Sequence, residues 1–405
     1  GIACSVGNDT GVPVMKEKIG RWILGIAFVL MLVENSISVK AAEESITADT
    51  LEKVQLQTEE RILEELDFAE IDQSLGKIFP EQKIRFREVL ETFLMGEEDQ
   101  LKETAIQYVS DLFSYEYRNQ KKNLVYMLLL AVTAAVFANF SGALKNKQAS
   151  QISFYVLYML LITVCLNTFR MAIGGVEHQL ELLSEFMKVL CPGYFLAVAL
   201  ASGSSSALIF YQIVLFVIYL VEVFILKFLL PVVHVYIMVQ VMNDMLGEET
   251  LSEFGELLKK TVLWSLKSLL GLVIGINVIQ GLLSPAIDTL KRTTVSKAIE
   301  AIPGIGNTFG SMTDVVLGTT VLIKNGIGVV GAALVLGICL LPIVQMVILT
   351  FLYKVTAALV QPISDKRITN CIGGVSSGYE LILKVLCTVM VLFLLTLAIV
   401  TASTS

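Results

Sequence analysis

The sequence predicts an all-α polytopic membrane protein. About eight transmembrane helices are expected, within a range of six to eight, preceded by a small helical extracytoplasmic domain. Hydrophobic residues make up 55% of the 405 residues and charged residues only 17%, with a mean hydropathy of +0.73. Soluble domains carry about 25% charged residues. The apolar excess is spread over many runs of membrane length, and the loops between them differ in the sign of their charge.

Residues 15–41 have the pattern of a signal peptide. A basic start with Lys16, Lys18 and Arg21 precedes a short apolar run, and small residues before Ala42 suit cleavage there. An uncleaved signal anchor is the alternative, and both place the following segment outside the cytoplasm. Residues 1–14 precede the first Met and are interpreted as an extension of doubtful origin.

Residues 42–122 are predicted to form an acidic, helical, extracytoplasmic domain. Apolar residues recur at helical spacing, and Pro80 and Gly96 divide the segment into two or three amphipathic helices. About 80 residues is near the lower size for an independent core. We therefore expect this segment to pack on the membrane domain or on a partner, with its acidic residues as a solvated face.

Residues 123–405 are predicted to form the polytopic membrane domain, because a span needs about 20 apolar residues. The predicted spans lie near residues 123–140, 152–173, 189–206, 207–230, 261–283, 303–323, 327–351 and 380–401. The apolar run breaks at Pro231, so residues 231–246, and likewise 352–360, are expected to be half-helices or re-entrant pieces. Six spans are the main alternative.

An inverted repeat is predicted between residues 189–283 and 300–401. Pro192 and Pro303 are separated by 303 − 192 = 111 residues, and Pro231 and Pro342 by 342 − 231 = 111 residues. The connecting loops are acidic in the first copy and basic in the second. Since basic loops favour the cytoplasm, the two copies would have opposite orientations, as in many transporters and channels.

Three ionisable residues in apolar segments are candidate pathway residues: Glu222, Asp314 and Lys324. Such groups are costly inside a membrane and normally face a bundle interior, a partner or a water-filled path. Helix–helix packing is the alternative for Glu222. Lys354 and Lys384 are interpreted as residues near span ends, whose side chains reach the interface.

Other classes of function find little support in the sequence. No Ser/His/Asp set, paired-carboxylate site or metal-ligand cluster is visible, so no enzymatic activity, cofactor or metal is expected. The net charge of −7 argues against nucleic acid as a partner.

The polar segment 291–307 orients the chain, because a basic loop between two spans is typical of the cytoplasmic side. Together with VLIKNGIGVVG (Val321–Gly331) and AALVQPISDKRI (Ala357–Ile368), it resembles the stage III sporulation protein AE family of endospore-forming bacteria. The residues that match the family motif here are Lys291, Arg292, Thr293, Thr294, Lys297, Pro303, Gly304, Gly306 and Asn307.

The resemblance implies a mother-cell protein of the outer forespore membrane that belongs to a channel, or feeding-tube, complex required for sporulation. The implied partners are the other subunits of its operon, including a secretion-type ATPase, and a forespore membrane protein. It brings no catalytic residues. A stand-alone secondary transporter or permease for a small molecule is the alternative function, and a scaffold that conducts nothing is a third.

Overall fold

The computed structural model describes most of residues 55–94, isolated positions between 110 and 136, and the greater part of residues 147–402. The short gaps in the last part are residues 203–205, 247–250, 300–305, 363 and 365. The chain divides into two compact units, residues 1–51 and the residues from Glu52 onward. The description below concerns this second unit. The predicted signal peptide and the extension before it lie outside the described residues.

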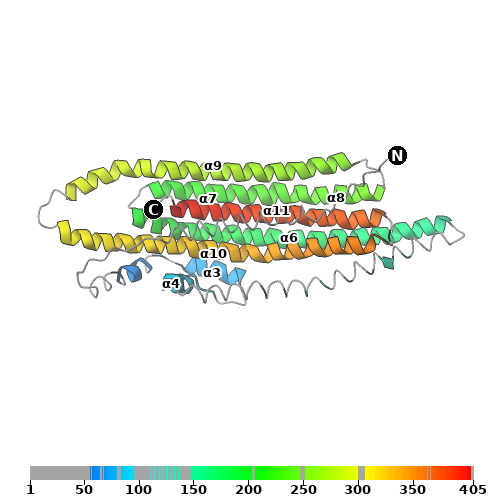
Figure 1. The fold of residues 1–405 in the computed structure, drawn as a ribbon, viewed down its shortest axis with the longest axis horizontal. Coiled ribbons are helices and arrows are strands. Elements are labelled where there is room, and N and C mark those ends of the chain that lie inside the picture. The colour runs from blue at the N-terminus through cyan, green and yellow to red at the C-terminus, as the bar shows by residue number, and fades with distance from the viewer. Residues whose placement is uncertain are drawn as a thin grey trace, which may run out of the picture. The chain divides into compact units, whose positions relative to one another are not determined.

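The described residues form helices and no strand (Figure 1). Two short helices come first, α3 (Ala69–Ile78) and α4 (Phe86–Leu94). The long elements are α6 (Lys147–Ser202), α7 (Ser206–Phe224), the π-helix η1 (Ile225–Leu229), α8 (Leu230–Leu246), α9 (Ser252–Ile299), α10 (Gly306–Val360) and α11 (Lys366–Ala402).

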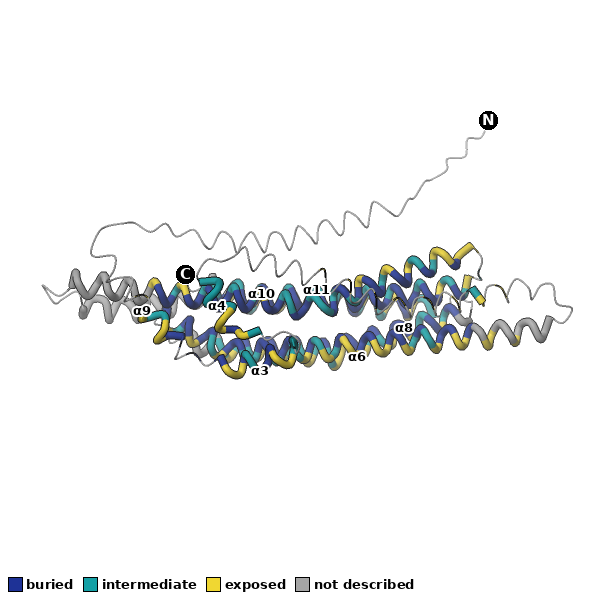
Figure 2. The backbone as a smooth tube through the Cα atoms, turned by 90° about the horizontal axis from the view of Figure 1, so that it is seen from below, coloured by how far each residue is buried: buried dark blue, intermediate teal, exposed yellow. Residues whose placement is uncertain are grey.

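The long helices lie side by side in a bundle, and α11 packs against α6, α8, α9 and α10 (Figure 1). α10 and α11 run in opposite directions, as do α9 and α10. The facing sides of the helices are buried along their length (Figure 2). Aromatic side chains fill the interior, among them Phe169, Phe186, Tyr194 and Tyr379, each at most 1% exposed. The predicted all-helical class is therefore confirmed for the described residues.

Among the described residues, four helices are long and apolar enough to cross a membrane: Tyr158–Ala201, Tyr211–Asp244, Gly318–Val360 and Lys366–Ala398. The predicted arrangement of six to eight short spans is corrected in two places. Spans 152–173 and 189–206 belong to one helix, α6, and spans 303–323 and 327–351 belong to one helix, α10. Charged residues at 177–188 suggested a loop, but the structure continues the helix through them and pairs some of them with neighbouring elements.

The expected break at Pro231 is wrong, because the helix continues through this residue, as it does at two other prolines. Pro192 lies inside α6 and Pro342 inside α10. Pro231 follows the π-helix η1, which joins α7 to α8 without interruption. A proline ring clashes with the carbonyl four residues earlier, here Lys227, and a local π-turn is a known adjustment that accommodates such a ring. Residues 231–246 and 352–360 are thus parts of long helices and not half-helices.

The short helices α3 and α4 pack on the bundle, α3 against α6 and α4 against α10. Asp72 joins the two, since its Oδ1 accepts a hydrogen bond of 2.7 Å from the backbone N–H of Phe86. Lys77 forms an ion pair of 2.7 Å with Glu185 of α6. This part of the acidic segment therefore has no separate core of its own. The inverted repeat stays a prediction.

Candidate functional site

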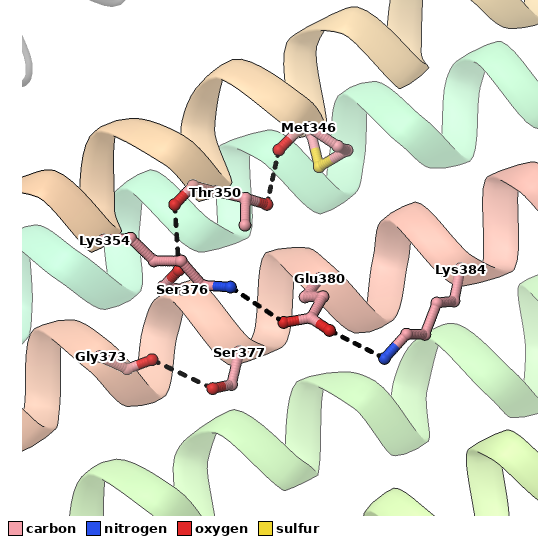
Figure 3. A network of polar contacts seen from close by, with 8 residues as sticks. All are labelled: Met346, Thr350, Lys354, Gly373, Ser376, Ser377, Glu380 and Lys384. Carbon is pink, nitrogen blue, oxygen red and sulfur yellow. Dashed lines mark hydrogen bonds and ion pairs between the residues drawn. The ribbon is translucent and has the colours of Figure 1, made fainter. Parts of the chain in front are cut away.

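An ion network joins α10 to α11 inside two of the candidate membrane helices (Figure 3). Glu380 of α11 accepts hydrogen bonds from Lys354 of α10 at 3.2 Å and from Lys384 of α11 at 3.0 Å. The three side chains are 47%, 41% and 37% exposed, in the order Lys354, Glu380 and Lys384. One carboxylate serves two ammonium groups, so the network carries a net charge of about +1.

Hydroxyl groups support the network from the same two helices. Ser376 donates a hydrogen bond of 3.1 Å to the carbonyl of Thr350, which ties α11 to α10 one turn from Glu380. Thr350 itself donates to the carbonyl of Met346 at 2.7 Å, and Ser377 donates to that of Gly373 at 3.2 Å. All three bonds satisfy hydroxyl groups, and the bond from Ser376 to Thr350 is the one among them that joins the two helices.

The interpretation of Lys354 and Lys384 as residues that snorkel from span ends stays a prediction, and the structure adds that both pair with Glu380. Lys384 lies in the middle of Lys366–Ala398, and Lys354 reaches across to the neighbouring helix. The spacing of Glu380 and Lys384 by four residues was a visible signal of a helical ion pair. Nothing in the sequence indicated that Lys354, 26 residues away from Glu380, completes the network.

Glu222, a predicted pathway residue, forms an ion pair with Lys188 of α6. The pair joins α6 to α7, and its side chains are 20% exposed for Glu222 and 40% for Lys188. Pairing across two helices satisfies the carboxylate, which favours the packing alternative. A pathway role for Glu222 stays a prediction.

Lys324 is fully buried, and its Nζ donates a hydrogen bond of 3.4 Å to the carbonyl of Thr401 in α11. The Thr401 hydroxyl in turn bonds to the hydroxyl of Tyr194 in α6. Gly328, one turn after Lys324, allows this approach, because a Cβ there would lie 2.6 Å from Thr401 Oγ1. Lys324 therefore belongs to a polar contact among α6, α10 and α11, separate from the Lys354–Glu380–Lys384 network.

The remaining predicted site residues are placed by their backbone alone. Lys291, Arg292, Thr293, Thr294 and Lys297 lie in the last turns of α9, so this part of the expected loop is helical. Pro303 and Gly304 lie outside the described residues. Gly306 and Asn307 begin α10, and Asp314 follows within it. α9 ends at Ile299 and α10 starts at Gly306, and residues 300–305 between them lie outside the described residues.

No group of three or more His, Cys, Asp or Glu that could hold a metal ion occurs among the described residues. Their five cysteines, Cys165, Cys191, Cys339, Cys371 and Cys387, are free thiols. The site therefore consists of ion pairs and hydroxyl groups between helices.

Comparison with known proteins identifies the family. The profile of the family described as stage III sporulation protein AE matches residues 84–404. The stage III sporulation protein AE of Bacillus subtilis (strain 168) is 24% identical over 391 residues, which covers 94% of this chain and 96% of that protein. No solved structure matches the chain. Because the family profile covers most of the chain, the protein belongs to the stage III sporulation protein AE family.

Proposed function

We propose that this protein is a membrane-embedded, non-enzymatic subunit of the channel complex between mother cell and forespore. It resides in the mother-cell membrane that surrounds the forespore, with its acidic N-terminal segment extracytoplasmic. Its partners are the other subunits of its operon, including a secretion-type ATPase, and a protein of the forespore membrane. Membership of a sporulation family, together with four apolar helices of membrane length, supports this proposal.

The exposure of the Lys354–Glu380–Lys384 network is the observation that supports a role within a larger assembly. Ionisable side chains within membrane helices normally face a bundle interior, a partner or a water-filled path. Here all three side chains are more than a third exposed on the isolated chain. A neighbouring subunit or an aqueous passage would remove the cost of placing them in lipid, as expected for a component of a larger conducting assembly.

The test is co-purification of the channel subunits from sporulating cells, combined with counts of heat-resistant spores. Glu380→Gln removes the carboxylate and leaves two ammonium groups uncompensated, so we expect weaker recovery of partners and fewer spores. Glu256→Gln is the matched control, because it removes an exposed ion pair with Lys260 on α9. Normal assembly and sporulation of the Glu380→Gln variant at wild-type protein levels would contradict the role assigned to the network.

A stand-alone transporter is distinguished by reconstitution. The purified protein in liposomes is expected to show no solute flux by itself, because a channel subunit needs its partners. Flux of a small solute by the protein alone, lost in the Glu380→Gln variant, would favour the transporter.

A further inference from the structure

Asp244, in the last turn of α8, is a carboxyl group that the fold buries without a counter-charge. Its side chain is 8% exposed. Oδ1 accepts a long hydrogen bond of 3.5 Å from Gln240 one turn earlier, and Oδ2 has no hydrogen-bond partner. Among the described residues no cation forms an ion pair with Asp244, in contrast to Glu222 and Glu380, which are each paired with lysine.

The backbone of α11 closes over this carboxyl group at Gly374. A Cβ at Gly374 would lie 3.4 Å from Asp244 Oδ2 and 2.8 Å from Cγ of Gln240. The absence of a side chain at this position thus lets the two helices meet around the carboxyl group. The group is held at a helix–helix contact, where water has little access.

Groups that can give or accept a proton surround Asp244 from three helices. Tyr158 of α6, Tyr236 of α8 and Cys371 of α11 each interact electrostatically with it, and all three are at most 4% exposed. Charged groups act on these neighbours from further away: Arg367 of α11 on Tyr158, and Glu256 of α9 and Glu380 of α11 on Tyr236.

An ionised carboxylate at this place would be costly. Removing such an ion from water without a partner is unfavourable, and buried groups commonly become neutral instead of staying charged. A metal cation is a poor solution, because hard cations need several oxygen ligands and no group of three or more His, Cys, Asp or Glu that could hold one occurs among the described residues. A proton, in contrast, needs only the free lone pair on Oδ2.

We propose that Asp244 is a proton-binding site of the folded bundle. The proton comes from bulk water, forms the O–H bond of a carboxylic acid at Asp244, and returns to water on release. Release would leave an uncompensated carboxylate against the backbone of α11, so occupancy of the site controls the contact between α8 and α11 at Gly374. This proposal does not depend on the role of the protein in a channel.

The test is infrared spectroscopy of the full-length protein in lipid nanodiscs at neutral pH. Ordinary aspartates are ionised at neutral pH, since their pKa is about 3.9. The wild type is expected to show the carbonyl band of a protonated carboxylic acid, which shifts when the protein is labelled with 13C at the aspartate carboxyl groups. The band should vanish in Asp244→Asn and remain in Glu256→Gln, which changes an exposed carboxylate on α9.

The absence of a label-sensitive band in the wild type would overturn the proposal, as would its persistence in Asp244→Asn. If Asp244→Asn does not fold, Asp314→Asn decides between Asp244 and Asp314, an aspartate near the start of α10. Retention of the band in Asp314→Asn supports Asp244 as the proton-binding group, and its loss assigns the proton to Asp314 and refutes the proposal.

Discussion

Gly378 of α11 lies where α8 and α6 leave no room for a side chain, so Gly378→Ala is expected to destabilise the bundle. A Cβ at this position would lie 2.0 Å from Cδ1 and 2.5 Å from Cγ1 of Ile237, and 3.0 Å from Cε2 of Phe169. Carbon atoms pack at about 3.5–4.0 Å, so the overlap with Ile237 is roughly 1.5 Å. Ile237 is fully buried and branched at Cβ, which restricts its escape to another rotamer.

The expected cost follows from two opposing effects. Overpacking of a core costs about 1–3 kcal/mol. Alanine is a better helix former than glycine by about 1 kcal/mol, which offsets part of that cost. We expect a net loss of up to about 2 kcal/mol, measured by thermal unfolding of the purified protein in detergent. Gly373→Ala is the matched control on the same helix, because no atom lies within 4 Å of its Cβ position, and it should be neutral or stabilising.

A double-mutant cycle with Ile237→Ala tests the cause. If the methyl group at position 378 collides with Ile237, shortening Ile237 makes room for it. The double variant should then be more stable than the sum of the two single losses by about 1 kcal/mol or more. Equal stability of Gly378→Ala and Gly373→Ala, or additive losses in the cycle, would refute the packing argument.

Three other predictions follow from the same structure. Gly328→Ala should lower thermal stability, because its Cβ would lie 2.6 Å from Thr401 Oγ1. Gly318→Ala is the control and should not lower it, because no atom lies within 4 Å of its Cβ position. Burial and the charge of Glu91 raise the pKa of Glu59, so the folded state binds a proton more tightly and stability falls as pH rises above 4.5. Glu59→Gln should reduce that fall, which unfolding at several pH values would detect. The inverted repeat predicts that residues 247–260 and 284–300 lie on opposite sides of the membrane. Single cysteines placed in each segment, in a background without native cysteines, should then be labelled from opposite sides. Labelling of both segments from the same side would contradict the inverted repeat.

Composition and hydrophobic runs were sufficient to predict the helical class, because an apolar segment in lipid must satisfy its backbone hydrogen bonds internally, as a helix does. The number of spans was not predictable by the same reasoning. Residues 174–188 contain three glutamates, a pattern that favours a loop between spans. In the fold, Glu185 pairs with Lys77 and Lys188 with Glu222, so partners distant in sequence allow the helix to continue.

Proline was misleading for a related reason. The penalty of proline in a helix is local, and it was interpreted as a break at Pro231. In the fold the helix continues into α8, and the π-helix before Pro231 provides the extra space, while α6 and α10 continue through Pro192 and Pro342.

The candidate site was partly visible in the sequence. Glu222 and Lys324 were selected because charge inside an apolar run is rare, and both make contacts between helices. The Lys354–Glu380–Lys384 network was missed because each member taken alone fits a helix end. Asp244 was missed because it precedes an acidic loop, where one more carboxylate carries no signal. In each case the sequence does not show which helix surfaces contact each other, because those contacts depend on the packing of the whole bundle.

The candidate membrane helices are longer than a bilayer requires, and the short helix α4 shows why the excess matters. Gly318–Val360 has 43 residues and is about 64 Å long, whereas the hydrocarbon core is about 30 Å thick. Leu90 and Leu94 of α4 cover Gly326 near the start of this helix, while the charged residues of α4, such as Arg87 and Glu91, pair with each other on its outer side. A helix with such a charged outer face does not belong in lipid. The region of α10 around Gly326 is therefore better placed outside the hydrocarbon on this side of the bundle, and an apolar stretch of this chain need not be a span along its whole length.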